Sequence, residues 1–159
     1  MDNPLNTLLR SLNSEFLMEV RAELSMQTIG DTPYGHRRIY HITGGYVKGL
    51  NIQGEILPGG GDGFLIRPDG TARLDVRLTV KTNDDALIYV TYQGILHHTL
   101  SLEKRLMAGE KVDWQEYYFR IAPFFETASE KYSYLNHTLA VGVGEADFSG
   151  VTYSFYRIL

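Results

Sequence analysis

The strongest constraint on the fold is a strict alternation of apolar and polar residues, clearest over residues 72–80. Leu74, Val76 and Leu78 fall on one side of the chain there, and Asp75 and Arg77 fall between them. Successive side chains of a β-strand point to opposite faces, so a period of two is typical of a half-buried strand. The segment therefore predicts a strand with one face turned toward a core.

The same alternation recurs along most of the chain. It predicts further strands over residues 16–27, 37–43, 46–57, 64–67, 87–92, 116–121, 134–143 and 151–158. Gly44-Gly45 indicates a break between two of them, and Gly49 and Gly54 indicate bulges or sharp bends. So many strands joined by short turns are typical of a sandwich or a closed barrel. Bent strands favour the barrel, since closure also removes exposed edges.

We therefore predict an all-β fold, a single antiparallel β-barrel of lipocalin-like size, as one domain over residues 1–159. Residues 1–14 are expected to form a short N-terminal helix or arm, with Pro4 suited to the first turn of a helix over residues 4–14. Residues 15–159 would be the barrel. Leucines and charges over residues 99–113 predict one short helical insertion, stopped at Gly109.

The composition limits the kinds of binding partner and the location that can be expected for this chain. The formal net charge of −4 argues against nucleic acid, which needs a basic surface. There is no run of like charge suited to a membrane surface, no apolar run long enough to span one and no secretion signal at the start, so a cytoplasmic location is expected. The chain has no cysteine and eleven tyrosines, and tyrosine suits both strands and half-polar cavities.

The glycine-rich stretch ILPGGGDGFLIRPDG, residues 56–70, is compatible with several kinds of loop. A nucleotide-binding loop would need a lysine and a following helix, and a calcium loop would need more acidic ligands. Neither pattern is present. The stretch therefore reads as turns: Gly59–Gly61 predict positive φ or a bulge at the barrel rim, and Pro68-Asp69-Gly70 predict a tight turn.

Several segments in order resemble a known family. They are GHRRIYHITGG (35–45), GEILPGGGD (54–62), RPDG (67–70) with LDVR (74–77), YFR (118–120), FFET (124–127), YLN (134–136) and VTYSFY (151–156). Their order and spacing resemble the domain of unknown function 3237 family, also called uncharacterised protein family 0311, over roughly residues 16–159. The resemblance implies a single lipocalin-like barrel and supplies no reaction. Two positions depart from the family pattern. The family usually has an aromatic residue, often Trp, where this chain has Gly63, and it usually has Trp where this chain has Tyr134.

Asp62 is the candidate catalytic residue. Glycines on both sides leave its carboxyl open to whatever the loop faces, and desolvation among aromatic residues would raise its pKa toward a range useful for general acid–base catalysis. Pairing with Arg67, Arg77 or Arg120 would lower that pKa instead. The alternative role is structural, with Asp62 accepting hydrogen bonds from backbone N–H groups of the turn.

The candidate ligand-binding residues are Arg67, Tyr118, Arg120, Tyr134 and Asn136. Tyr118 and Arg120 share one face of a predicted strand, and Tyr134 and Asn136 share a face of another. Pointing into a barrel, these side chains would form a polar floor able to hold a carboxylate or enolate oxygen. A hydrogen-bond network that only satisfies itself remains open, as does an outer face for Arg120.

No metal site or cofactor is predicted. His97 and His98 are adjacent and so point to opposite faces of a strand, and the other histidines lack zinc-type spacing. Two functions remain in view: a barrel whose interior cavity binds a small, largely apolar or aromatic molecule, and a cofactor-independent isomerase, cyclase or lyase that uses Asp62 as its acid or base. A filled barrel with a structural or oligomeric role is a lesser alternative, and a homodimer is plausible.

Overall fold

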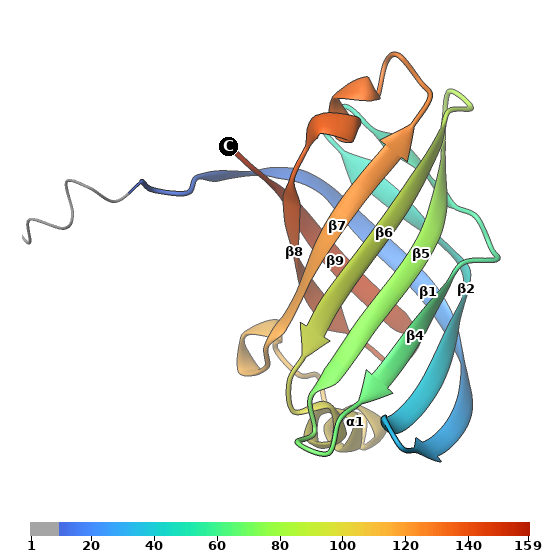
Figure 1. The fold of residues 1–159 in the computed structure, drawn as a ribbon, viewed down its shortest axis with the longest axis vertical. Coiled ribbons are helices and arrows are strands. Elements are labelled where there is room, and N and C mark those ends of the chain that lie inside the picture. The colour runs from blue at the N-terminus through green and yellow to red at the C-terminus, as the bar shows by residue number, and fades with distance from the viewer. Residues whose placement is uncertain (1–9) are drawn as a thin grey trace, which may run out of the picture.

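The structure is a computed structural model that describes residues 10–159 (Figure 1). In chain order its elements are β1 (Ser14–Thr32), β2 (Gly35–Gly49), β3 (Gln53–Ile56), β4 (Gly61–Ile66), β5 (Ala72–Thr82), β6 (Leu87–Leu96), α1 (Thr99–Met107), η1 (Trp114–Glu116), β7 (Phe119–Thr127), η2 (Ser133–His137), β8 (Ala140–Ala146) and β9 (Gly150–Ile158), where η marks a 3-10 helix. The predicted all-β class is confirmed.

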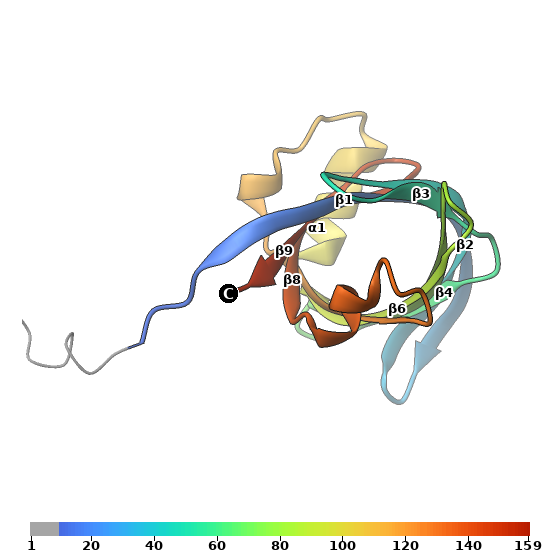
Figure 2. The ribbon, with the colours of Figure 1, turned by 90° about the horizontal axis from the view of Figure 1, so that it is seen from above.

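All nine strands of the described residues belong to one sheet, and every recorded pairing is antiparallel. Because β1 pairs with β2 as well as with β9, the sheet closes into a ring around a central axis (Figure 2). One closed sheet excludes the sandwich, which would need two. The strands run obliquely to the long axis, as Figure 1 shows.

The glycine-rich stretch interrupts one strand position of this ring. β3 and β4 both lie between β2 and β5, β3 along one part of them and β4 along another. The residues that join β3 to β4 therefore lie within the wall of the ring. The sequence predicts them at the rim, and this prediction is wrong. Gly59 has φ +111°, and a Cβ on Gly60 would meet the carbonyl oxygen of Arg77 at 2.4 Å, so both positions require glycine.

Several strand boundaries differ from the prediction. Gly44-Gly45 does not end a strand, because β2 runs through both residues with a register shift opposite Glu23 and Leu24. The predicted strand over 46–57 is split by a turn at residues 50–52. Residues 134–137 belong to η2 and not to a strand. The predicted turn of residues 67–70 is confirmed, since the Gly70 N–H donates to the Arg67 carbonyl oxygen.

The helical expectations have two outcomes. Most of the helix predicted over residues 4–14 lies outside the described residues, and Ser14 already belongs to β1. The short helix predicted within residues 99–113 is α1, and Gly109, with φ +80°, follows it two residues on. Among residues 10–159, no helix combines the length and apolar character needed to cross a lipid bilayer.

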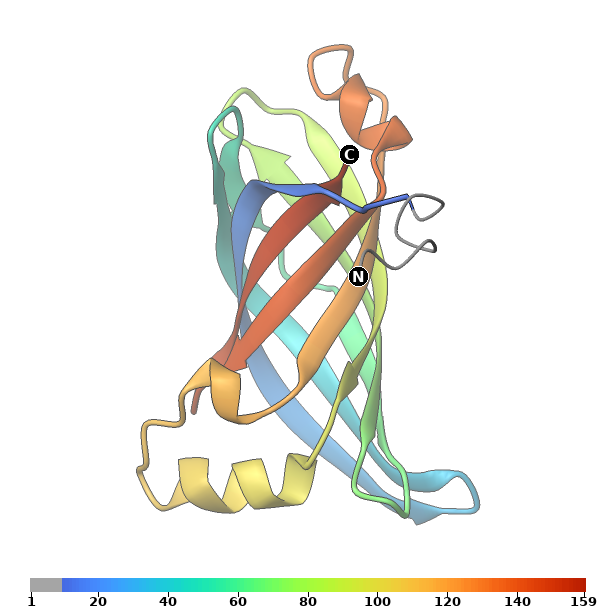
Figure 3. The ribbon, with the colours of Figure 1, turned by 90° about the vertical axis from the view of Figure 1, so that its left-hand side faces the viewer.

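The alternation along each strand sends one set of side chains into the ring. On β5, Leu74, Val76, Leu78 and Val80 are all buried, as predicted. Helix α1 lies across one end of the ring and η2 lies at the other end (Figure 3). These two ends of the interior differ, because a cavity opens beneath α1.

Candidate functional site

A cavity of about 450 Å³ occupies the α1 end of the ring. Its walls come from the inner faces of β1, β2 and β4 to β9, and side chains of α1 cover it. Met26, Met107 and Phe148 line it and are exposed, so they mark where the cavity meets solvent. Sites for small molecules commonly measure about 300–1,000 Å³ and are mostly apolar, and this cavity meets both conditions.

Aromatic rings form the floor of the cavity. Tyr153 packs edge-on against Tyr92 and Phe119, with ring centroids 5.5 and 5.4 Å apart. Phe155, which is not part of the cavity lining, lies against both tyrosines. We call Tyr92, Phe119, Tyr153 and Phe155 the aromatic floor. Edge-to-face pairs of this kind hold rings in fixed orientations. The floor therefore separates the hollow end of the interior from the filled end.

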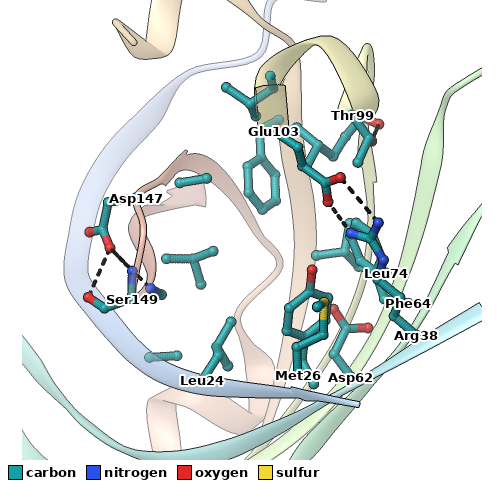
Figure 4. Close-up of a pocket in the computed structure, with 18 of the residues that line it drawn as sticks. Leu24, Met26, Arg38, Asp62, Phe64, Leu74, Thr99, Glu103, Asp147 and Ser149 are labelled. Carbon is teal, nitrogen blue, oxygen red and sulfur yellow. Dashed lines mark hydrogen bonds and ion pairs between the residues drawn. The ribbon is translucent and has the colours of Figure 1, made fainter. Parts of the chain in front are cut away.

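Asp62 is on the inner face of β4, directly opposite Tyr40 of β2, and it lines the cavity (Figure 4). Only 7% of its surface is exposed. Burial raises the pKa of its carboxyl from 3.8 to about 7, against the lowering effect of a 2.9 Å hydrogen bond from the Asp75 N–H to Oδ1. Asp62 is therefore divided between its neutral and charged forms near neutral pH, as the desolvation argument from the sequence expected.

The arginines proposed as partners of Asp62 are engaged elsewhere. Arg67 pairs with Asp69 at 2.8 Å, and Arg77 pairs with Asp75 at 3.2 Å. The nearest cationic influence comes from Arg37, which lowers the pKa of Asp62 by its charge and donates a hydrogen bond to the Gly63 carbonyl oxygen at 2.7 Å. A Cβ on Gly63 would approach this arginine and not the cavity.

Among the described residues, Arg38 is the one cation in the cavity lining, and it faces Glu103 of α1 (Figure 4). Both nitrogens of the guanidinium fork bond to the carboxylate, one of them at 3.1 Å. Burial opposes the charge of Arg38, but hydrogen bonding to Glu103 and Tyr40 outweighs it and raises the pKa of the guanidinium. This pair ties the helix to the wall of the ring.

A third acidic residue of the lining, Asp147, is held by several partners. Its carboxylate pairs with Arg21 and accepts hydrogen bonds from the N–H groups of Ser149 and Gly150 at 2.8 and 3.0 Å. The hydrogen bond with Arg21 and those with Ser149 lower its pKa against the opposing effect of burial. Asp147 therefore fixes the loop between β8 and β9, which borders the cavity mouth.

The five predicted ligand-binding residues do not line the cavity. Arg67 is held by Asp69, and the Arg120 guanidinium lies over the exposed Tyr118 ring, 5.0 Å from its centroid, while Phe119 points inward between them. Tyr134 and Asn136 lie on η2, at the far end of the ring, where Asn136 bonds to the backbone of Thr127. An aromatic floor takes the place of the expected polar one, and a ligand-binding role for these five residues stays a prediction.

Sequence reasoning missed the polar residues that do line the cavity, chiefly Arg38, Tyr40, Tyr92, Glu103 and Tyr153. The alternation Arg38-x-Tyr40-x-Ile42 was a signal, because it places an arginine on the same face as a buried isoleucine. Nothing in the sequence indicated that Glu103 would reach this arginine. In the part of the chain that the structure describes, no three His, Cys, Asp or Glu side chains gather closely enough to hold a metal ion.

The fold and the site together define an all-β protein with one closed antiparallel sheet and a mainly apolar cavity at one end. The chain belongs to the family described as "Protein of unknown function (DUF3237)", whose model matches residues 12–158. It is 33% identical to the UPF0311 protein RPA1785 of Rhodopseudomonas palustris over 150 residues, which cover 94% of this chain and 98% of the relative. The crystal structure of RPA1785 superposes with a TM-score of 0.88 and covers 95% of this chain and all of that one.

Two further likenesses bear on the fold and the site. A structure from Acinetobacter baumannii described as a beta-barrel like protein is 35% identical, covers both chains completely and has a TM-score of 0.81. The hydroalkoxylation enzyme phnH of Penicillium herquei is 30% identical over 102 residues, which are 64% of this chain and 52% of that protein.

Proposed function

We propose that this protein uses its ring as a lipocalin-like barrel, that it binds a small, largely apolar or aromatic molecule in the cavity, and that Asp62 acts on that molecule as a general acid and base without a cofactor. The observation that carries the proposal is a buried carboxyl group at the wall of an otherwise mainly apolar cavity of about 450 Å³. A carboxyl group near its midpoint at neutral pH can both give and take a proton.

The reaction class we propose is the addition of a hydroxyl group across a carbon–carbon double bond within one molecule, or its reverse. The name of the phnH relative supports this class. Neutral Asp62 would give its proton to one alkene carbon while the hydroxyl oxygen bonds to the other carbon. The carboxylate would then take the hydroxyl proton and return to its starting form. The O–H bond and the π bond break, a C–H and a C–O bond form, and no electrons are gained or lost.

The surroundings of Asp62 suit such a transfer. Burial raises the pKa of the hydroxyl groups of Tyr40, Tyr92 and Tyr153, so they stay protonated and can donate hydrogen bonds that orient an oxygen of the ligand. A ligand that fills the cavity would displace water from around Asp62. The aromatic floor supplies flat apolar surface for an unsaturated or aromatic skeleton.

The proposal can be tested on molecules that co-purify with the native protein. Mass spectrometry should find one small molecule on the wild type and on Asp69→Asn, a control that changes an aspartate outside the cavity. Leu24→Trp, which fills the cavity from β1, should not retain it. A Leu24→Trp variant that retained the same molecule would show that the cavity is not the binding site.

Turnover separates catalysis from binding alone. Incubated with the recovered molecule and with 2-allylphenol, a phenol that carries a double bond, the wild type should form an isomer of unchanged mass with an altered retention time. Asp62→Asn should lose about 10²–10⁴-fold in rate, the usual contribution of a positioned acid or base. If wild type binds but never converts these molecules, the protein is a carrier and the catalytic part of the proposal is wrong.

A further inference from the structure

The polar lining of the cavity includes a pair that the proposed function does not use, Arg38 and Glu103. Tyr40 links this pair to the neighbourhood of Asp62. Arg38 lies opposite Phe64 in the pairing of β2 with β4, and Asp62 lies opposite Tyr40. Arg38 and Tyr40 both point into the cavity, two residues apart on one strand. Two residues of a strand span about 7 Å, roughly the width of one aromatic ring system.

Stability gives no good reason for a charge pair at this place. The Arg38 side chain is 13% exposed and that of Glu103 is 28% exposed. A largely buried ion pair recovers little more than the cost of removing both ions from water, and apolar residues of similar size often serve as well. The pair also leaves a cost behind, because the Nε–H of Arg38 is a buried side-chain donor without a partner among the described residues.

The pair can open on one side only. Glu103 is the more exposed partner and sits on a helix that spans only Thr99–Met107, so its carboxylate can turn to solvent. Arg38 is fixed in the wall of the ring by β2 and remains the sole cation that the described residues contribute to the lining. A guanidinium fork binds two oxygens of a carboxylate or a similar planar group side by side. Glu103 therefore occupies the position that such a group on a ligand would take.

We propose that Arg38 is the specificity-determining anchor of the cavity, and that it selects aromatic or apolar molecules that carry a carboxylate by exchanging Glu103 for the ligand. This inference rests on the proposed function, since it names the polar group of the molecule that the cavity takes. The carboxylate would lie against Arg38 beneath α1, and the skeleton would extend over Phe64 toward Asp62 and the aromatic floor. Asp62 then meets an atom about one ring width from the anchored group.

A matched pair of probes tests the anchor. We would measure the binding of 2-naphthoate and of its neutral counterpart 2-naphthamide to the wild type by calorimetry. Because hydrogen bonds between Arg38 and a carboxylate contribute more binding free energy than those to a neutral amide, naphthoate should bind roughly 10–100-fold more tightly than naphthamide. In Arg38→Gln/Glu103→Gln that preference should fall to within about threefold. The double variant removes both charges together, so no buried charge is left uncompensated.

Three further variants locate the effect. Arg37→Gln removes the same charge one residue away, outside the cavity lining, and should keep the preference. Glu103→Gln removes the competing carboxylate and should bind naphthoate several-fold more tightly than the wild type does. Arg38→Lys keeps the charge without the fork and should lose most of the preference, so it tests the anchor even if the double variant fails to fold, which thermal unfolding would show.

The possible results lead to different conclusions. An unchanged preference in the double variant overturns the anchor, as does an unchanged preference in Arg38→Lys if the double variant does not fold. Equal binding of the two probes by the wild type overturns it as well. In that case the cavity still binds ligands and the proposed function stands. If Leu24→Trp binds both probes as the wild type does, the probes lie elsewhere and the anchor is wrong. If neither probe binds the wild type, the anchor and the aromatic ligand class of the proposed function both fail.

Discussion

The two ends of the ring interior are built from the same alternating strands but have different contents. On β5, Leu74 and Val76 line the cavity, whereas Leu78 and Val80, further along the same face, are buried in the filled end. On β6, Tyr92 lines the cavity, while Ile88 and Val90 pair with Val80 and Leu78 in the filled end. An inward-facing pattern therefore specifies a closed ring without specifying whether that ring is full.

The difference arises from what closes each end. At the filled end, Tyr132 and Leu135 are 3% and 1% exposed, so the segment around η2 contributes side chains to the core. At the other end, α1 places Leu102 and Leu106 over the cavity and joins the wall through the Arg38–Glu103 pair. The helix covers its end of the ring without filling it. The aromatic floor lies between the cavity and the packed side chains of the filled end.

The largest expected difference between the ends concerns the pH dependence of stability around Asp62. Its pKa is raised to about 7 by burial, so between pH 4 and 7 the folded state holds a proton that the unfolded state has lost. The free energy of unfolding contributed by this group therefore falls as pH rises through that window, by as much as about 4 kcal/mol. Asp62→Asn should be more stable than the wild type at pH 8 by up to that amount, and by little at pH 4.

Chemical denaturation across pH 4–8 checks this expectation. The amide oxygen introduced by Asp62→Asn can still accept the Asp75 N–H, so the substitution removes the ionisation and keeps the recorded hydrogen bond. Asp69→Asn is the control, because it leaves Asp62 in place and should not gain stability as the pH rises. A stability difference between Asp62→Asn and wild type that stayed constant over this range would mean that burial does not raise the pKa of the Asp62 carboxyl.

The next largest contrast compares two leucines of β5 on the same face. Leu78→Ala, in the filled end, should cost about 2–5 kcal/mol of unfolding free energy, because it leaves a new void among packed neighbours. Leu74→Ala, in the cavity wall, should cost about 1–2 kcal/mol, since part of its surface faces the cavity and fewer contacts with protein atoms are lost. Urea unfolding of both variants measures the difference. Equal costs would show that the hollow end is as tightly packed as the filled one.

Much of the fold could be predicted from the sequence, because alternation and turn residues are local signals. The strand of residues 72–80, the turn at residues 67–70 and the short helix before Gly109 all appear in the structure. The break at Gly44-Gly45 was wrong for a reason that the sequence does not carry. A Cβ on Gly45 would meet the Arg21 carbonyl oxygen at 1.9 Å, so this glycine permits a close approach between β1 and β2 within a continuous strand.

The site was less predictable, since it depends on contacts between distant segments. Asp62 could be singled out because its flanking glycines leave its carboxyl uncrowded, but it was expected in a rim loop, and the structure places it within strand β4. The Arg38–Glu103 pair joins residues 65 positions apart and could not be read from spacing. Tyr118 and Arg120 share a face as predicted, but Phe119 takes the inward direction, because a strand carries alternate side chains to opposite faces and the larger apolar one is buried.

The smallest expected effect belongs to Asp84, at the filled end, and its sign is opposite to that of Asp62. Asp84 pairs with Lys131 at 2.7 Å and accepts hydrogen bonds from the hydroxyls of Thr82 and Tyr132. These partners hold the pKa of Asp84 well below its usual range, and Lys131 has the largest effect. Its stabilising contribution is present above pH 4 and is lost as the pH falls further. Asp84→Asn should therefore lower the unfolding midpoint slightly at pH 7, and the loss should shrink below pH 4.

Thermal unfolding at two pH values and two salt concentrations distinguishes this effect from a packing change. Because Asp84 is exposed, salt should screen its pairing with Lys131 and reduce the difference from wild type. Asp85→Asn is the matched control: its side chain is 83% exposed and reaches Lys81 only at 3.5 Å, and asparagine tolerates its φ of 66°. The stability of Asp62→Asn relative to wild type should rise with pH, and that of Asp84→Asn should fall. If both changed in the same direction, the difference in burial between the two aspartates would not explain their opposite pKa shifts.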